Sequence, residues 1–182
     1  EMALVSHLMR RAGFGTTPDE LEEYTAKGYE AVVEDMVTPE RCPGIEEDIV
    51  SRYWGGEAQG IWVGTWIYRM ANTRRPLVEK MALFWHHVLA TGISKTEHSV
   101  SSIAQIDMFR QIGMSDLKTV LLEVSKDPAM IYWLDNNENK LGEPNENYGR
   151  ELLELFSMGV GNYTEDDIKN ASRAFTGWTF TQ

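Results

Sequence analysis

The chain has 182 residues, of which 42% are apolar and 25% are charged, a composition typical of a folded globular protein rather than a disordered one. The formal net charge of −11 argues against binding to nucleic acid or anionic lipid, because both need clustered Lys and Arg side chains. The single cysteine, Cys42, excludes an internal disulfide, and its position before "PG", with no histidine close in sequence, does not predict a reactive thiol.

The beginning of the chain, "EMALVSHLMRRAGFG", carries charge at both ends of a short amphipathic stretch and lacks the pattern of a signal peptide. Because the first residue is Glu1, we expect a mature form or a fragment, which leaves a removed export signal open. The longest segment without Asp, Glu, Lys or Arg, residues 81–94, is too short to cross a bilayer. The sequence therefore predicts no membrane insertion.

The first well-delimited helix is predicted in "TPDELEEYTAKG". Thr17 has the character of an N-cap, Pro18 occupies the first helical position, and Glu20 is three residues after Thr17, where a capping box needs it. Gly28 ends the segment, as glycine commonly does after a helix. These signals predict both ends of the helix.

The rest of the chain also reads as helices separated by turns such as "PERCPG" and "YWGGE". The further predicted helices are residues 29–37, 58–72, 76–90, 106–112, 116–126, a short one after Asp127, 146–158, and 164–176, which begins with the capping box "TEDD". No run with a period of two predicts a strand. The predicted fold class is therefore all-α, an irregular bundle of about eight to ten helices without a sheet, in a single domain over residues 1–182.

Two adjacent histidines, His86 and His87, lie in the apolar stretch "EKMALFWHHVLATG". At about 100° per residue, Glu79 and His86 fall on one line of this helix. The opposite stripe is apolar and consists of Leu77, Met81, Phe84 and Val88. A helix that is apolar nearly all round is expected to be central, so Glu79 and His86 should face other parts of the protein. They are two turns apart, about 10.5 Å, too far for both to bind one metal ion.

Partners for His86 are predicted in "PNENYGRELLELFSMG". A helical wheel places Tyr148, Leu152, Leu155 and Phe156 on the core face. Glu151 and Glu154 lie three residues apart along one edge of that face, so both carboxylates can reach one point. We predict that His86, Glu151 and Glu154 bind a divalent metal ion, the only cofactor suggested, or act in acid–base catalysis of a hydrolytic or oxidative reaction.

Structural interpretations of the same residues stay open. His86 would then be a hydrogen-bonded core histidine, and His87 a surface residue. Glu79 would pair with one of Arg69, Arg74 or Arg75 across the preceding turn. Glu154 would pair with Arg150.

Two non-catalytic functions follow from these interpretations. The first is a scaffold or assembly module in which a buried hydrogen-bond network fixes helix register; its predicted members are Asn145, Asn147, Glu151 and His86. The second is a binding module that uses an aromatic face with Trp62 and Trp66. In either case the partner would be a protein or the remainder of a longer chain.

Four stretches, in this order, resemble the bacterial domain of unknown function 1800 family: "LMRRAGFGTTPDELE", "PLVEKMALFWHHVLATG", "DPAMIYWLDNNEN" and "PNENYGRELLELFSMGVGNYTEDDIKNASRAFTGW". The resemblance covers nearly the whole chain. It implies that the chain corresponds to the N-terminal part of a longer family domain, in which later residues would complete a site. It also favours an extracytoplasmic location, and it implies no established activity.

The chain departs from the family at two positions. Where the family reads Trp-His-Asn-His-Phe, this sequence has "WHHVL" at residues 85–89, so His86 matches and Val88 replaces the second histidine. This replacement weakens the metal interpretation. Gly149 stands where the family has Ala, which is expected to loosen the helix slightly.

Overall fold

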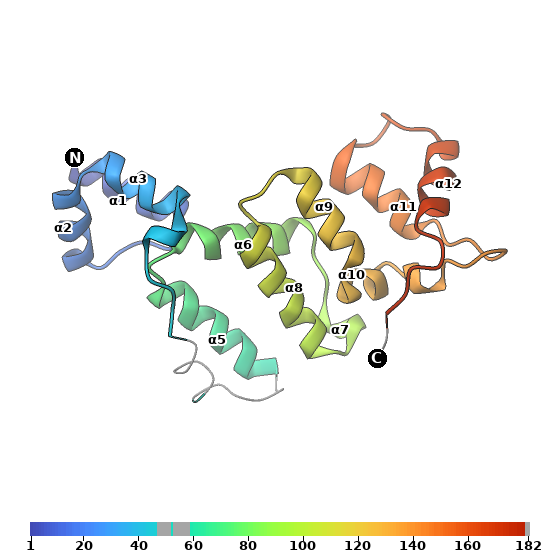
Figure 1. The fold of residues 1–182 in the computed structure, drawn as a ribbon, viewed down its shortest axis with the longest axis horizontal. Coiled ribbons are helices and arrows are strands. Elements are labelled where there is room, and N and C mark those ends of the chain that lie inside the picture. Colours follow the sequence, from blue (N-terminus) through green and yellow to red (C-terminus); the bar gives the residue numbers. More distant parts are fainter. Residues whose placement is uncertain (47–51, 53–58, 181–182) are drawn as a thin grey trace. The chain divides into compact units, whose positions relative to one another are not determined.

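The computed structural model describes residues 1–46, 52 and 59–180 (Figure 1). The described residues form eleven α-helices, of which nine have six residues or more, and the only β-type pairing among them is an isolated bridge between Lys140 and Glu143. The predicted all-α fold class is confirmed. None of the helices in these ranges combines the length and apolarity that a bilayer-spanning segment requires.

The chain divides into two compact units, residues Glu1–Phe84 and Trp85–Gln182. In unit 1, helices α1, α2 and α3 pack against one another (Figure 1). Their shared core contains Val5, Met9, Val32 and Met36. The elements of unit 1 are α1 (Met2–Ala12), α2 (Pro18–Lys27), α3 (Tyr29–Val37), the 3-10 helix η1 (Pro39–Arg41), α5 (Gln59–Asn72) and the first part of α6 (Pro76–Val88). The predicted break at "YWGGE" lies outside the described residues.

Helix α2 begins and ends where the sequence predicts. The Thr17 hydroxyl accepts a hydrogen bond from the Glu20 N–H at 3.3 Å, and the Glu20 carboxylate accepts one from the Thr17 N–H at 2.9 Å. Gly28, which follows the helix, has φ 94°, a left-handed conformation that costs other residues more. Local capping chemistry therefore fixes both ends.

The apolar stripe predicted for α6 is not its buried face. Phe84 is 48% exposed and Val88 is exposed as well, whereas Glu79 and Ala82 are buried. The helix face with Glu79 and His86 therefore points inward, as predicted. The opposite face is exposed to solvent at Phe84 and Val88, so α6 is not buried on all sides. A wheel identifies which residues share a face, and the neighbouring elements decide which face is covered.

Unit 2 continues from the end of α6 through α7 (Ile93–Thr96), α8 (Ser99–Ile112), α9 (Leu117–Lys126), α10 (Pro128–Trp133), the 3-10 helix η2 (Asn136–Glu138), α11 (Asn147–Glu151), the π-helix η3 (Leu152–Ser157) and α12 (Glu165–Ala174). Its fully buried side chains include Phe109, Val120, Val124, Met130 and Ile168. Helices α11 and α12 lie side by side (Figure 1).

The prediction of one continuous α-helix over residues 146–158 is wrong in its second half, where the chain forms η3. The Met158 N–H donates to the Leu153 carbonyl five residues earlier, at 2.9 Å, whereas an α-helix would use the carbonyl four residues earlier. A wider turn rotates the residues that follow away from their positions on an α-helical wheel. This rotation explains why Leu155, predicted in the core, is 65% exposed while Tyr148, before the π-helix, is buried.

Candidate functional site

His86 lies near the end of α6, and its imidazole is half-buried, with the Nδ1 atom buried. The ring forms a hydrogen bond with the Gln105 side chain of α8. Burial lowers the pKa of His86 below the ordinary 6.5, because removal from water disfavours the charged imidazolium; the hydrogen bond with Gln105 acts in the opposite direction. His87 is exposed, as the structural interpretation predicts.

Gln105 connects this histidine to the interior of unit 2. Its side chain is 0% exposed. Its amide oxygen accepts a hydrogen bond from the Thr91 hydroxyl at 2.8 Å, and its amide nitrogen donates to the Asp127 carboxylate at 2.7 Å. One buried side chain therefore joins α6, the segment after α6, α8 and the start of α10.

Asp127 is the least expected member of this network. It is the N-cap of α10, and its carboxylate accepts a hydrogen bond from the Met130 N–H at 2.8 Å. The side chain is buried, and this removal from water raises its pKa from 3.8 to about 6. The hydrogen bonds from Met130 and Gln105 favour the charged carboxylate and so lower the pKa, but by less than burial raises it. The sequence "DPAM" predicts the cap but gives no sign of the long-range contact with Gln105.

The two predicted carboxylates lie in consecutive elements, Glu151 in α11 and Glu154 in η3. Glu151 is half-buried at the end of α11. Glu154, in η3, accepts a hydrogen bond from the Tyr163 hydroxyl at 2.6 Å. The predicted pairing of Glu154 with Arg150 is wrong, because the Arg150 guanidinium forms two hydrogen bonds with Glu165 of α12, at 3.0 and 2.9 Å. Arg150 also has an i,i+4 ion pair, but with Glu146, 3.5 Å away, rather than with Glu154.

Among the described residues, no three side chains of His, Cys, Asp or Glu gather closely enough to hold a metal ion. The shared metal or catalytic role of His86, Glu151 and Glu154 stays a prediction. The contacts given above bring His86 together with Gln105 and Asp127 instead.

A second polar network joins the loop before α11 to α12. The buried Asn139 amide donates to the Ser172 carbonyl at 2.8 Å, and its side-chain oxygen accepts from the Asn145 N–H at 3.2 Å. Asn145 lies one residue before Glu146, the N-cap of α11, and in turn accepts from the Asn147 N–H at 2.9 Å. Asn145 and Asn147 thus belong to a network with Asn139, a member that the sequence does not reveal. The network predicted to join these two asparagines to Glu151 and His86 stays a prediction.

In unit 1, the buried Glu79 carboxylate accepts a hydrogen bond from the Trp66 indole at 3.1 Å. Of the arginines suggested as its partners, Arg74 pairs with Glu23 at 3.6 Å, and Arg75 donates to the Cys42 carbonyl at 2.8 Å. The Trp62 and Trp66 rings are half-buried, so the aromatic-face module stays a prediction.

The sequence model of the family described as Protein of unknown function (DUF1800) matches residues 7–182. The chain belongs to this family. No match was found among curated proteins or among solved structures. The DUF1800 match includes every element that carries the candidate site, and it confirms the family predicted from the four quoted stretches.

The structure explains one departure of this chain from the DUF1800 pattern. A Cβ atom at Gly149 would lie 2.4 Å from the Ser172 hydroxyl oxygen and 2.9 Å from the Ser172 backbone nitrogen. Glycine therefore allows α11 and α12 of this DUF1800 member to approach closely, rather than simply loosening the helix.

Proposed function

We propose that unit 2 of this DUF1800 chain is a non-catalytic scaffold, in which buried polar side chains hold the helices in register. The observation that carries the proposal is the position of Gln105, whose fully buried amide bonds to His86, Thr91 and Asp127. A buried polar group without partners is costly, so a displacement of any one of these elements would leave the others destabilised. Such a network favours a single arrangement of helices, the property required of a module that presents a fixed surface.

The first test is His86→Ala. We expect the free energy of unfolding to fall by about 1–2 kcal/mol, because the buried Gln105 amide loses one partner. The decrease is measured by urea denaturation, and elemental analysis of the purified protein is expected to give the same metal content before and after the substitution.

His87→Ala is the matched control, since His87 is the exposed neighbour on the same helix and should leave stability almost unchanged. A stoichiometric metal ion in the wild type that is lost in His86→Ala would reject the scaffold proposal in favour of the predicted metal site. An unchanged free energy of unfolding would also reject it.

Acid–base chemistry is a second candidate function, with Asp127 in addition to the predicted His86. It is favoured by the pKa values, because burial raises that of Asp127 to about 6 and lowers that of His86 from 6.5. Burial thus moves the two pKa values toward each other, and Gln105 lies between the two side chains, so the charge of one can affect the titration of the other. The candidate predicts that Asp127→Asn displaces the titration of His86 measured by NMR, and an unchanged titration curve would remove it.

A further inference from the structure

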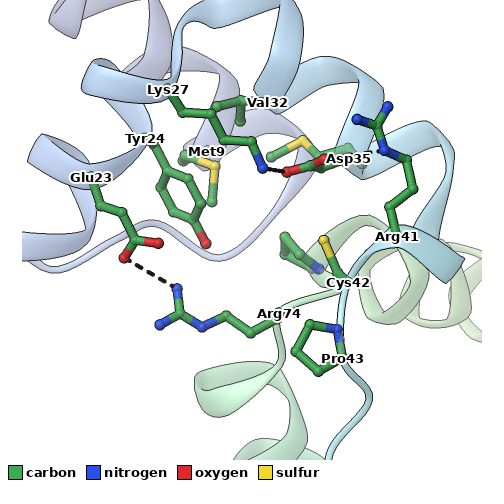
Figure 2. Close-up of a pocket in the computed structure, with 12 residues that line it drawn as sticks. Met9, Glu23, Tyr24, Lys27, Val32, Asp35, Arg41, Cys42, Pro43 and Arg74 are labelled. Carbon is green, nitrogen blue, oxygen red and sulfur yellow. Dashed lines mark hydrogen bonds and ion pairs between the residues drawn. The ribbon is translucent and has the colours of Figure 1, made fainter.

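We propose that unit 1 contains a binding site for a small organic carboxylate with an apolar body, in the pocket between α2, α3, η1 and the turn before α6 (Figure 2). The pocket has a volume of about 290 Å³. It is formed entirely by residues of unit 1, so the proposal is independent of the function proposed for unit 2.

The floor of the pocket is apolar. Met9, Val32 and Met36 are buried side chains of the core between α1 and α3, and they also line the pocket. The Tyr24 ring forms part of the wall (Figure 2). A volume at the lower end of the range for ligand pockets, with an apolar floor, suits a compact hydrocarbon group rather than a hydrated inorganic ion.

The rim of the pocket carries three cationic side chains from three segments, together with the carboxylates of Glu23 and Asp35. Lys27 of α2 is paired with Asp35, whose side chain is 13% exposed, so this ion pair is part of the wall. Arg41 of η1 and Arg74 before α6 also line the pocket, and each side chain is about half-exposed. The Arg41 guanidinium is directed toward Asp35, and the Arg74 guanidinium toward Glu23 (Figure 2).

The partners of these two arginines are easily exchanged. Arg41 lies 3.5 Å from Glu34 and Arg74 lies 3.6 Å from Glu23, and both glutamates are more than half exposed. Arg74 also forms a hydrogen bond with the Tyr24 side chain. Ion pairs of this length and exposure contribute little to stability, so either guanidinium can turn toward a ligand at low cost. Arg41 also approaches the Asp35 carboxylate, at 3.7 Å, which keeps its guanidinium at the pocket.

The chemistry of the rim and floor together defines the ligand. The planar guanidinium presents a fork of N–H donors that matches a carboxylate in a bidentate arrangement. The floor offers contact to an aryl or branched alkyl group, which inorganic phosphate does not have. A carboxylate at the rim with an apolar body on the floor satisfies both.

The thiol of Cys42 gives a direct test, because it lines the pocket, its sulfur points toward the space between Arg41 and Arg74 (Figure 2), and it is the only cysteine in the chain. The rates of its alkylation by iodoacetate, an anion, and by iodoacetamide, its neutral analogue, are measured and expressed as a ratio. N-acetylcysteine gives the reference ratio. Without a site for anions, the net charge of −11 should repel iodoacetate and bring the ratio below the reference.

We expect a ratio about tenfold above the reference, the effect of one charge-assisted hydrogen bond to the reagent. Arg41→Gln and Arg74→Gln should each lower it toward the reference, and Arg10→Gln, an exposed arginine of α1 outside the pocket lining, should not. Phenylacetate should slow both alkylations in the wild type, and benzyl alcohol, which lacks the carboxylate, should not.

Circular dichroism establishes that the three variants remain folded. A ratio at or below the reference overturns the proposal, as does an equal decrease in Arg10→Gln, which would indicate general charge rather than a site. A Cys42 that reacts with neither reagent also overturns it, because the pocket would then be closed to small molecules. None of these results depends on the stability measurements at His86, so the two proposals fail separately.

Discussion

Replacing Gly149 by Ala should lower the free energy of unfolding by about 2–3 kcal/mol, the typical cost of forcing extra volume into a well-packed contact. The new Cβ would lie 2.4 Å from the Ser172 hydroxyl oxygen, 2.9 Å from the Ser172 nitrogen and 3.2 Å from the Ile168 carbonyl oxygen. Two of these three atoms belong to the backbone of α12, so α11 and α12 would have to separate. Urea denaturation followed by circular dichroism measures the loss.

The double variant Gly149→Ala, Ser172→Ala separates the side-chain contact from the backbone contacts. Removing the hydroxyl relieves the shortest contact but not the approach to the Ser172 nitrogen, so we expect partial recovery of stability. Gly44→Ala is the control, since its Cβ would meet nothing closer than the Arg75 guanidinium carbon at 3.9 Å. A Gly149→Ala variant as stable as the wild type would mean that α11 and α12 are not in close contact.

The second large effect concerns pH and Asp127. Burial raises the pKa of its carboxyl in the folded state from 3.8 to about 6, so the folded protein binds this proton more tightly than the unfolded chain. The resulting contribution to stability is fully present below about pH 4 and is lost as the pH rises toward 6. A shift of about two units corresponds to about 3 kcal/mol, which Asp127→Asn should remove from the pH dependence.

His86 acts in the opposite direction, since its pKa is lowered in the folded state and its contribution is lost as the pH falls below 6.5. For this reason the quantity to compare is the difference in free energy of unfolding between the wild type and Asp127→Asn, measured by urea denaturation from pH 4 to pH 7. In that difference the contribution of His86 cancels to the extent that Asp127→Asn leaves the titration of His86 unchanged, which the NMR measurement determines. A difference that does not change with pH would show that the Asp127 carboxyl titrates at its ordinary pKa.

Where a capping motif is present, the sequence reveals helix ends better than it reveals which helix faces are buried. The start of α8 lacks such a motif, and the prediction places it at residue 106 instead of Ser99. Thr17, Gly28 and Thr164 act through hydrogen bonds and backbone conformations within a few residues, so their local pattern is sufficient. Phe84 and Leu155 were predicted in the core and are exposed. The exposure of Phe84 depends on which neighbouring elements cover α6, and the exposure of Leu155 depends on the π-helix. A periodic pattern of apolar residues encodes neither of these.

The candidate site shows the same limit. His86 is recognisable because a histidine is unusual in an apolar stretch. Gln105 and Asp127 cannot be recognised as site residues from the sequence, because their hydrogen bond joins residues 22 positions apart. Each also has an ordinary local interpretation, Gln105 as a residue of α8 and Asp127 as the N-cap of α10. A long-range contact between common polar residues leaves no signature at either position.

The wide turn of η3 has a consequence for insertions and deletions. A π-helix accommodates one residue more between a carbonyl and its N–H partner than an α-helix does. Removing a single residue from Leu152–Ser157 would let the segment rewind as a regular helix continuous with α11, without breaking the chain on either side. We therefore expect this to be the place in unit 2 where chain length varies most readily, at the cost of a rotated C-terminal end of the segment.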